Sequence, residues 1–281
     1  MKSFISEDDI EQAICNRLSQ PEFGWKRIEC DARVEAQDDV SATGRANAAE
    51  CILPDVLLAS LKRINPQAEE STLQEIVHDL RKDFTGTDMV DTNYSLYLKI
   101  RNGINVQVHR NDKEDFDIIK LIDFDHPNAN DFHCVNQMWI KGHYRYRRPD
   151  VLLFVNGLPL VFIELKNSTV KVEESYNKNL TSYRQDIPNI FAFNQICVLS
   201  NGLQTKMGAW TSSYEFFFEW LRVDNEKEQL NREQIAEHGL SITNLMDGLF
   251  RKERLIDYIE NFVLYDNRRT KIIAKNHQYL G

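Results

Sequence analysis

Apolar residues near the start of the chain recur at intervals of three and four positions, the spacing of one face of a helix. The stretch 7–19 shows this spacing, and Ser6 with Asp9 approximates the capping box that begins many helices. The same spacing recurs after Pro54 and again after Ser71, which has a glutamine three residues later as its capping partner. The first part of the chain is therefore predicted to be largely helical.

From about residue 104 the pattern changes to alternation and to short apolar runs, which are typical of strands. The two most apolar runs are 151–155 and 158–165, and Asn156-Gly157 between them is a strong signal for a hairpin turn. This order of elements predicts an α/β fold in which helices pack on a mostly antiparallel or mixed sheet. Further strands are predicted over 104–108, 118–124, 132–140 and 193–199, and further helices over 172–184, 215–221, 226–237 and 242–262.

Charged residues stand at the ends of this apolar hairpin. Asp150 precedes the first strand, and Glu164 and Lys166 lie two residues apart at the end of the second strand, so these two side chains project to the same face. Carboxylates at the ends of buried strands are costly to shield from water unless they are paired or bind an ion. Two carboxylates suit Mg²⁺, which prefers oxygen ligands, keeps several waters and bridges to phosphate oxygens. The pattern indicates hydrolysis of a phosphodiester with a metal ion, in which Lys166 orients the attacking water and stabilises the developing negative charge.

The turn of the hairpin decides whether the two carboxylates can share an ion. A regular hairpin with a two-residue turn would pair Asp150 with Ile163 and would place Glu164 on the opposite face. A three-residue loop over 156–158 would pair Val155 with Pro159, and therefore Asp150 with Glu164. A bulge elsewhere in the hairpin would restore the same pairing. We predict one of these two irregularities.

Each half of this pattern is common by itself. A Glu-x-Lys at the end of a strand is more often a solvated strand end than a catalytic pair, and x-Pro-Asp is a frequent turn. The combination of both halves through one short apolar hairpin is much rarer by chance. Two other functions are compatible with parts of this pattern: a catalytically silent DNA-binding or scaffold module with the same fold, and a glycosidase with two carboxylates. The intact set of three residues disfavours the first, and Lys166 has no assigned role in the second.

The composition indicates a globular protein and excludes several other classes, but it does not indicate a function. The chain has 281 residues, of which 42% are hydrophobic and 27% are charged, so one large globular domain fits best. Its five cysteines form no CxxC pair, which suggests buried thiols rather than disulfides or a zinc module. The acidic N-terminus and the lack of a long apolar run predict a cytoplasmic protein without a membrane segment. The net charge of −9 argues against a generally basic nucleic-acid-coating protein, but allows a local basic patch.

The stretch 121–167 resembles the N-terminal nuclease domain of the restriction (R) subunit of type I restriction-modification enzymes. The similarity rests on the pieces FDHPNANDF, VNQ, RRPD, FVNGLPL and ELKN, which occur in the order and spacing of that family. It extends over essentially the whole chain through SEDDIEQAICNRL, IPNIFAFNQICVLSNG, the segment 210–220 and AKNHQYLG. The resemblance implies a PD-(D/E)xK restriction-endonuclease-like core, with a mixed central sheet flanked by helices.

In that core, Asp150, Glu164 and Lys166 match the catalytic residues one by one. The expected metal ligands are Asp150, Glu164 and the backbone carbonyl of Leu165, and the expected cofactor is Mg²⁺. Members of the family also tend to carry a Gln-x-x-x-Tyr on the following helix. Here the aligned residues are Asn179 and Tyr183, so the glutamine is replaced by the shorter asparagine. We take both as candidate DNA-binding residues, although packing on an amphipathic helix is at least as common a role for a tyrosine such as Tyr183.

Two further residues are candidates for contact with DNA, and one more for the metal. The stretch 141–148 is basic and aromatic within an acidic chain, and it ends with Arg147 and Arg148 just before Asp150. Arginine binds phosphate through two hydrogen bonds, so we predict that this pair contacts the DNA backbone, although a solvated strand edge is an equally common reading of such a run. On the first helix, Glu11 could approach the metal, but we expect it to face the surface.

The resemblance also implies how the domain is used. In the family it precedes two helicase-like motor domains that hydrolyse ATP to translocate DNA, and this chain contains no P-loop pattern of its own. We therefore expect residues 1–260 to form the nuclease domain and 261–281 to be a connector toward a motor domain. The predicted function is a Mg²⁺-dependent endonuclease that cuts unmodified double-stranded DNA after ATP-driven translocation. Its expected partners are the methylation (M) and specificity (S) subunits and its own motor domains, with no membrane partner.

Overall fold

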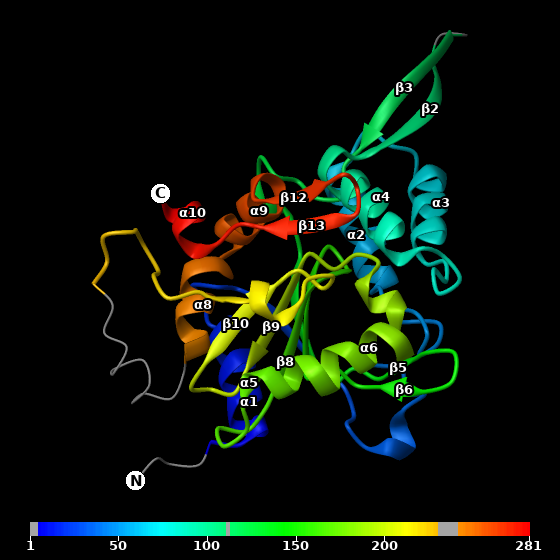
Figure 1. Cartoon of the computed structure of the whole chain (residues 1–281). Coiled ribbons are helices and arrows are strands. Elements are labelled where there is room, and N and C mark those ends of the chain that lie inside the picture. Colours follow the sequence, from blue (N-terminus) through cyan, green and yellow to red (C-terminus); the bar gives the residue numbers. More distant parts are fainter. Residues whose placement is uncertain (1–4, 111–112, 230–240) are drawn as a thin grey trace.

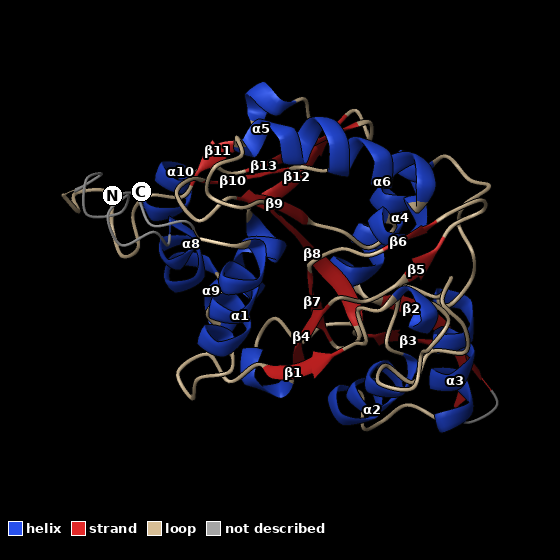
Figure 2. Ribbon diagram, turned by 90° about the horizontal axis from the view of Figure 1, so that it is seen from below, coloured by secondary structure: helices blue, strands red, loops and turns tan. Residues whose placement is uncertain are grey.

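A seven-stranded mixed sheet forms the centre of the molecule (Figures 1 and 2). The computed structural model describes residues 5–110, 113–229 and 241–281. Two neighbouring pairs of strands run parallel, β1 with β4 and β8 with β9, and the other neighbours are antiparallel. The predicted α/β fold with a mixed sheet flanked by helices is confirmed. In the order of the sheet, the strands are β1 (Lys26–Glu29), β4 (Phe132–Asn136), β7 (Val151–Val155), β8 (Leu158–Leu165), β9 (Ile196–Ser200), β10 (Thr205–Gly208) and β11 (Phe218–Glu219).

Helices cover both faces of the sheet, as Figure 2 shows. Side chains of β7 alternate between the two cores, with Val151 and Leu153 on one side and Leu152 and Phe154 on the other. Because both faces are buried, the central strands read as continuous apolar runs rather than as alternating ones. The first face is covered by α1 (Glu7–Leu18), α8 (Ser241–Leu249) and α9 (Lys252–Asn261), and the second by α5 (Val172–Glu174), the π-helical turn η3 (Ser175–Leu180) and α6 (Thr181–Asp186).

The remaining elements lie around this layered body. Three helices pack near the hairpin turn of β7 and β8, and a two-stranded ribbon projects from them at the top of Figure 1. No helix among the described residues is both long and apolar enough to cross a membrane. The three helices are α2 (Pro54–Ile64), α3 (Glu70–Leu80) and α4 (Met89–Asn102), and the ribbon consists of β2 (Ile104–Arg110) and β3 (Lys113–Ile119). Elsewhere lie helix α10 (Asn276–Leu280) and the strands β5 (Ile140–Lys141), β6 (Tyr146–Arg147), β12 (Val263–Asp266) and β13 (Thr270–Ile273). Short 3-10 turns are η1 (Val34–Ala36), η2 (Pro127–Ala129), η4 (Pro188–Phe191) and η5 (Tyr214–Phe216).

Helix starts were predicted with mixed success. The capping box of α1 is confirmed, because Asp9 donates its N–H to Ser6 Oγ over 3.1 Å and Ser6 donates its N–H to Asp9 Oδ2 over 3.0 Å. Helix α2 begins at Pro54, as predicted. The capping box at Ser71 is wrong, since α3 begins at Glu70 and its N-cap, Glu69, makes no side-chain cap.

The prediction of a helix over 215–221 is also wrong. After a short 3-10 turn, the chain extends into β11, which pairs with β10 at the edge of the sheet. Phe217 is buried in the second core, so tertiary packing overrides the local pattern here. Of the helix predicted over 226–237, residues 230–237 lie outside the described residues, and 226–229 form no helix. Helix α4 was not predicted.

The β7–β8 hairpin contains the irregularity that the chemistry requires. The turn is Asn156-Gly157, both with positive φ (49° and 81°), and it pairs Val155 with Leu158. The three-residue loop is therefore wrong. The alternative is confirmed, because the register shifts between Leu153 and Phe154, which leaves Leu160 as an extra residue of β8. Beyond the bulge Val151 pairs with Ile163, and this register places the next residues outward, Asp150 and Glu164, opposite each other.

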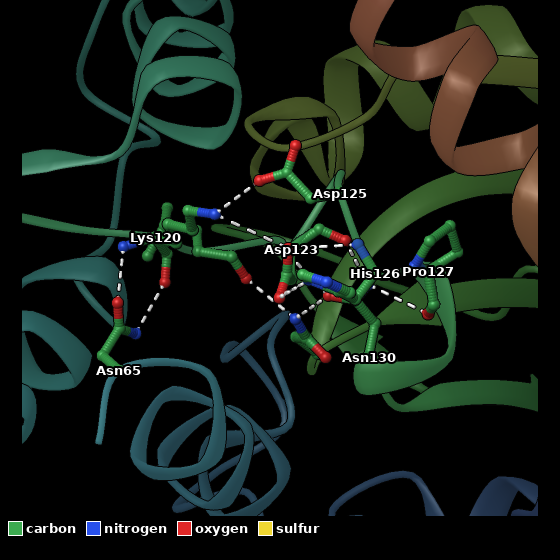
Figure 3. A network of polar contacts seen from close by, with 9 residues as sticks. Asn65, Lys120, Asp123, Asp125, His126, Pro127 and Asn130 are labelled. Carbon is green, nitrogen blue, oxygen red and sulfur yellow. Dashed lines mark hydrogen bonds and ion pairs between the residues drawn. The ribbon is translucent and has the colours of Figure 1, made fainter.

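The turn is held from outside the hairpin by a network of asparagine side chains. Figure 3 shows Asn65 bonded to the backbone of Lys120, and Asn130 bonded to the backbone of Asp123. Asn130 Oδ1 also accepts a hydrogen bond of 2.8 Å from Asn156 Nδ2. Asn156 Oδ1 in turn accepts the N–H of Asp131 over 2.7 Å. The segment that contains FDHPNANDF therefore fixes the closed end of the hairpin, at the opposite end of the strands from Asp150.

Residues 261–281, expected to be a connector, are hydrogen-bonded to the body of the domain. Tyr97 Oη donates to the carbonyl of Val263 over 2.7 Å, and Tyr258 Oη donates to that of Ala274 over 2.6 Å. The side chain of Lys271 on β13 is fully enclosed, with Nζ bonded to Gln195 Oε1 over 2.7 Å. The segment thus completes the first core, and its connection to a motor domain stays a prediction.

Replacing Gly157 tests how strongly this turn determines the fold. A Cβ at Gly157 would lie 2.5 Å from the carbonyl oxygen of Leu53, and its φ of +81° is unfavourable for any L side chain. We expect Gly157→Ala to lower the free energy of unfolding by about 1–3 kcal/mol or more, measured by urea denaturation. Gly86→Ala is the control, because a Cβ there meets nothing within 4 Å and its φ is not positive. Equal stability of the two variants would contradict this role of the turn.

Candidate active site

The three residues singled out in the sequence meet at one edge of the sheet, where β7 begins and β8 ends. Asp150 directly precedes β7, Glu164 is the penultimate residue of β8, and Lys166 directly follows that strand. Glu164 is only 2% exposed, whereas Asp150 and Lys166 are partly accessible. Figure 2 views the molecule from below, with α1 on one side of β7 and β8 and α6 on the other.

Hydrogen bonds fix the relative positions of these side chains. The N–H of Leu165 donates to Asp150 Oδ2 over 2.7 Å, which ties the start of β7 to the end of β8. Lys166 Nζ donates to the carbonyl of Leu165 over 2.7 Å and to Glu164 Oε1 over 3.4 Å. The expectation that Glu164 and Lys166 share a face is therefore met.

Burial raises the pKa of both carboxyl groups. Burial is the main cause at Asp150 and raises its pKa to about 6, although the N–H of Leu165 and the Lys166 ammonium oppose the shift. Burial, followed by repulsion from Asp150, raises the pKa of Glu164 well above its ordinary value. Two carboxylates with one lysine leave an excess of negative charge in a poorly hydrated place. A cation bound between them would relieve this excess.

The arrangement of oxygen atoms also fits a metal ion. Glu164 Oε2 is fully enclosed and has no hydrogen-bond partner among the described residues, which is costly for a carboxylate oxygen unless a cation or water reaches it. The described residues contain no group of three or more His, Cys, Asp or Glu side chains that could hold a metal. An ion here would thus have two carboxylate ligands and would complete its shell with water or substrate, as Mg²⁺ commonly does. The third predicted ligand, the carbonyl of Leu165, already accepts the hydrogen bond from Lys166.

Glu11 is a third carboxylate beside the site, and the expectation that it faces the surface is wrong. It is 4% exposed and accepts hydrogen bonds from Asn136 Nδ2, over 2.7 Å, and from Gln137 Nε2. Burial raises its pKa, and its charge in turn contributes to the raised pKa of Asp150. A signal was present in the sequence, because Glu11 stands three and seven positions before Ile14 and Leu18 on the buried stripe of α1.

Gln137 links this carboxylate to Asp150. It follows β4 directly, has a positive φ of 58°, and donates its N–H to the carbonyl of Asp150 over 3.0 Å. Few residues other than glycine adopt such a φ without a local reason. The bend at the end of β4 therefore brings the Gln137 side chain to Glu11 while its backbone holds Asp150. The VNQ motif was recognised in the sequence, but this role was not.

Asn179 and Tyr183 both lie beside Glu164. Asn179, in the π-helical turn η3, donates to Glu164 Oε1 and thereby orients that carboxylate. Tyr183, in α6, is 6% exposed, packs edge-to-face on Phe162, and lies 3.2 Å through Oη from the carbonyl of Arg148. Their roles in DNA binding stay predictions, and the structure assigns both to protein contacts around the site.

Arg147 and Arg148 are likewise engaged with the protein. Arg147 forms an ion pair with Asp186 at the end of α6, with Nε and Nη2 at 2.7 and 2.5 Å from Oδ2. Arg148 donates to the carbonyl of Ala32, and its guanidinium lies 5.0 Å from the centroid of the Trp139 ring. Their contact with DNA also stays a prediction.

The raised pKa of Asp150 makes stability depend on pH in a defined direction. Between the ordinary pKa of 3.8 and about 6, the folded chain holds a proton that the unfolded chain releases, so the free energy of unfolding falls as pH rises through this window. Asp150→Asn removes the cost of burying a charged carboxylate at this position. In chelator at pH 7, we expect it to raise the free energy of unfolding by about 1–3 kcal/mol, with a smaller difference near pH 4.

Asp131→Asn is the control with the opposite sign. Burial raises the pKa of Asp131, but its bonds to Lys26 and Arg63 outweigh burial and lower it to about 2. The substitution should therefore destabilise the protein at pH 7. If Asp150→Asn destabilised the protein equally at pH 4 and pH 7, the Asp150 carboxylate would not destabilise the metal-free fold as we propose.

Known proteins resemble this chain over most of its length. Residues 4–216 match the family model described as type I restriction enzyme R protein N terminus. The chain is 31% identical to the type I restriction enzyme HindI endonuclease subunit of Haemophilus influenzae, over 99% of this chain and 26% of that protein. It is also 31% identical to the putative type I restriction enzyme MjaIXP endonuclease subunit of Methanocaldococcus jannaschii, over 82% of this chain and 23% of the relative. The chain thus spans about a quarter of the length of these relatives, and it belongs to the family of type I restriction enzyme R protein N termini.

Proposed function

We propose that this chain is a nuclease domain that hydrolyses phosphodiester bonds of double-stranded DNA, with Asp150, Glu164 and Lys166 as its catalytic residues. The observation that carries the proposal is the pairing of two carboxylates across the bulged hairpin, where one enclosed oxygen of Glu164 has no hydrogen-bond partner among the described residues. The names of the relatives, which are endonuclease subunits, agree with this chemistry.

Asp150 and Glu164 would hold a Mg²⁺ ion. When bound, the ion would neutralise charge on the phosphate and lower the pKa of a coordinated water. The two carboxylates are already oriented for this task, Asp150 by the N–H of Leu165 and Glu164 by Asn179. Little reorganisation is therefore required when substrate arrives, which is the main advantage of a site built at the ends of rigid strands.

Lys166 has a separate role. Its Nζ lies between Glu164 Oε1 and the carbonyl of Leu165, and the side chain is 17% exposed. From this position it can donate a hydrogen bond to the attacking water or to a phosphate oxygen that gains negative charge. Lys166 thus supplies positive charge to the developing negative charge on the phosphate, whereas the two carboxylates serve to hold the metal ion.

In the complete enzyme, we propose that this domain cuts unmodified DNA after motor domains outside this chain have used ATP to translocate it. The partners would be the methylation and specificity subunits and those motor domains. This part of the proposal rests on family membership, since the relatives are about four times longer than the chain.

Single alanine substitutions test the three catalytic residues. In the complete endonuclease subunit, Asp150→Ala, Glu164→Ala and Lys166→Ala should each reduce restriction of unmodified phage in cells by at least about 100-fold, the usual effect of losing a group that stabilises the transition state. ATP hydrolysis by the purified complex should continue, because the motor is separate. Asp79→Ala and Lys82→Ala are controls and should restrict normally. These variants break an exposed ion pair between Asp79 on α3 and Lys82, which follows the helix. Normal restriction by any of the three variants would remove that residue from the catalytic set.

Metal binding tests the two carboxylates independently of cleavage. Calorimetry with Mn²⁺ or Mg²⁺ should show binding to the wild-type chain and loss of binding in Asp150→Ala and Glu164→Ala. Because the pKa of Asp150 is about 6, binding should release protons near pH 6 and weaken as pH falls below it. DNA cleavage should also stop in chelator. Cleavage that persists in chelator, with contaminating nuclease excluded, would refute a metal-dependent mechanism.

A further inference from the structure

The hairpin formed by β5 and β6 presents basic and aromatic side chains that the catalytic site does not use. The N–H of Gly142 donates to the carbonyl of Arg145 over 2.8 Å, which leaves His143 and Tyr144 as the two residues of the turn. Tyr144 is 89% exposed, and its ring packs edge-to-face on His143 with 4.2 Å between centroids. We refer to His143, Tyr144 and Arg145 as the hairpin tip.

The base of this hairpin is firmly anchored. A Cβ on Gly142 would lie 1.6 Å from the carbonyl oxygen of Asp186, so the turn is packed directly against the end of α6. Arg147 pairs with Asp186, and Tyr146 Oη donates to Asp38 over 2.7 Å. A tip held in this way can bind a partner with little loss of conformational entropy.

The charges around the hairpin leave the tip basic. Two carboxylates that lie against the hairpin, Asp38 and Asp186, are each bonded to a residue of β6. A third, Asp83, is close enough to interact with the charge of His143 and accepts hydrogen bonds from Thr85 and Asn189. The Arg145 side chain, in contrast to Arg147 and Arg148, has no hydrogen bond or ion pair with any residue that the structure describes. In a chain of net charge −9, this tip is a local site for a polyanion.

The chain length between the tip and the catalytic carboxylates limits their separation. Arg145 and Tyr144 stand five and six residues before Asp150. Because an extended chain spans at most ~3.6 Å per residue, the tip lies within about 20 Å of that carboxylate. A duplex rises about 3.4 Å per base pair, so this reach corresponds to about six base pairs. Figure 2 shows β5 and β6 beside α6, which covers the second core. Because side chains alternate along a strand, Asp150 and Glu164 project to this same face, each two residues from a member of that core, Leu152 and Phe162.

We propose that the hairpin tip is a contact for double-stranded DNA beside the phosphate that is cut, with Arg145 on a backbone phosphate and Tyr144 against the adjacent sugar and base edge. Basic and aromatic side chains together are suited to this task, because the cation supplies salt-dependent attraction and the ring supplies contact area. The assignment rests on the proposed nuclease function. It differs from the sequence prediction, since Arg147 and Arg148 hold the hairpin in place while the tip contacts the DNA.

The test is DNA binding in chelator, which prevents cleavage and separates this proposal from the catalytic one. Fluorescence anisotropy with a labelled 30-base-pair duplex at low salt would compare the wild-type 281-residue chain with Tyr144→Ala, Arg145→Ala and the double variant. We expect each single variant to bind about 5- to 10-fold more weakly and the double variant more weakly still. Arg145→Ala should reduce the slope of log affinity against log salt by about 0.9, the value for one lost phosphate contact, and Tyr144→Ala should leave that slope unchanged.

The control variant is Phe216→Ala with Lys275→Ala, an exposed aromatic and basic pair near the C-terminal hairpin. It should bind DNA as the wild type does, and circular dichroism should show that all variants are folded. Unchanged affinity and slope in the tip variants, or equal weakening in the control, would overturn the proposal. So would normal DNA binding combined with loss of assembly with the other subunits, which would make the tip a protein contact. Weakened binding in the tip variants would support the tip as a DNA contact even if Asp150→Ala still cleaved DNA and thereby refuted the catalytic assignment.

Discussion

The single extra residue in β8 is the constraint on which the site depends. Side chains alternate along a strand, so a regular two-residue hairpin would leave Asp150 and Glu164 on opposite faces of the sheet. The bulge at Leu160 shifts the parity, and the burial of both Leu160 and its neighbour Val161 in the first core shows that the strand changes face there. The turn is therefore free to keep the favourable Asn-Gly geometry, while the far end of the hairpin acquires the pairing that the chemistry needs.

Three acidic side chains, Glu11, Asp150 and Glu164, lie at this end of the hairpin, where water has little access. Burial raises the pKa of Glu11, Asp150 and Glu164 together, and Lys166 is the basic side chain that contacts Glu164. Such an arrangement lowers the stability of the metal-free fold at neutral pH. Rigid supports offset this cost: the N–H of Leu165, the amides of Asn136 and Gln137, and Asn179 each bind one of the carboxylates. The amide side chains orient the acids without neutralising them, and so they leave the charge available to a cation.

The sequence was informative where local physics determines the structure. The α1 capping box, the Asn-Gly turn and the apolar runs of β7 and β8 each have a short-range cause, and each is found as predicted. The capping box at Ser71 is wrong because α3 begins one residue earlier, at Glu70, which places Ser71 inside the first turn. The helix predicted over 215–221 is wrong because the packing of Phe217 in the second core overrides the local pattern. The position of the bulge could not be predicted from the sequence. The requirement that Asp150 and Glu164 share a face calls for one extra residue in the hairpin, but it does not say which residue that is. Glu11 is buried although it is charged, because its place on the apolar stripe of α1 turns it toward the sheet, where Asn136 and Gln137 bind its carboxylate.

The distances along the chain between the acidic groups have a consequence for how the molecule assembles. The bond between Asp150 and Leu165 closes a segment of 15 residues, whereas the bond between Glu11 and Asn136 joins residues 125 apart. Closing the longer segment loses more chain entropy, so local contacts form more readily than distant ones. A newly made chain can thus form the hairpin with its two carboxylates and lysine before α1 docks and adds Glu11. The acidic cluster of Glu11, Asp150 and Glu164 is therefore complete only when the whole domain has folded. Synthesis of the hairpin alone does not form it.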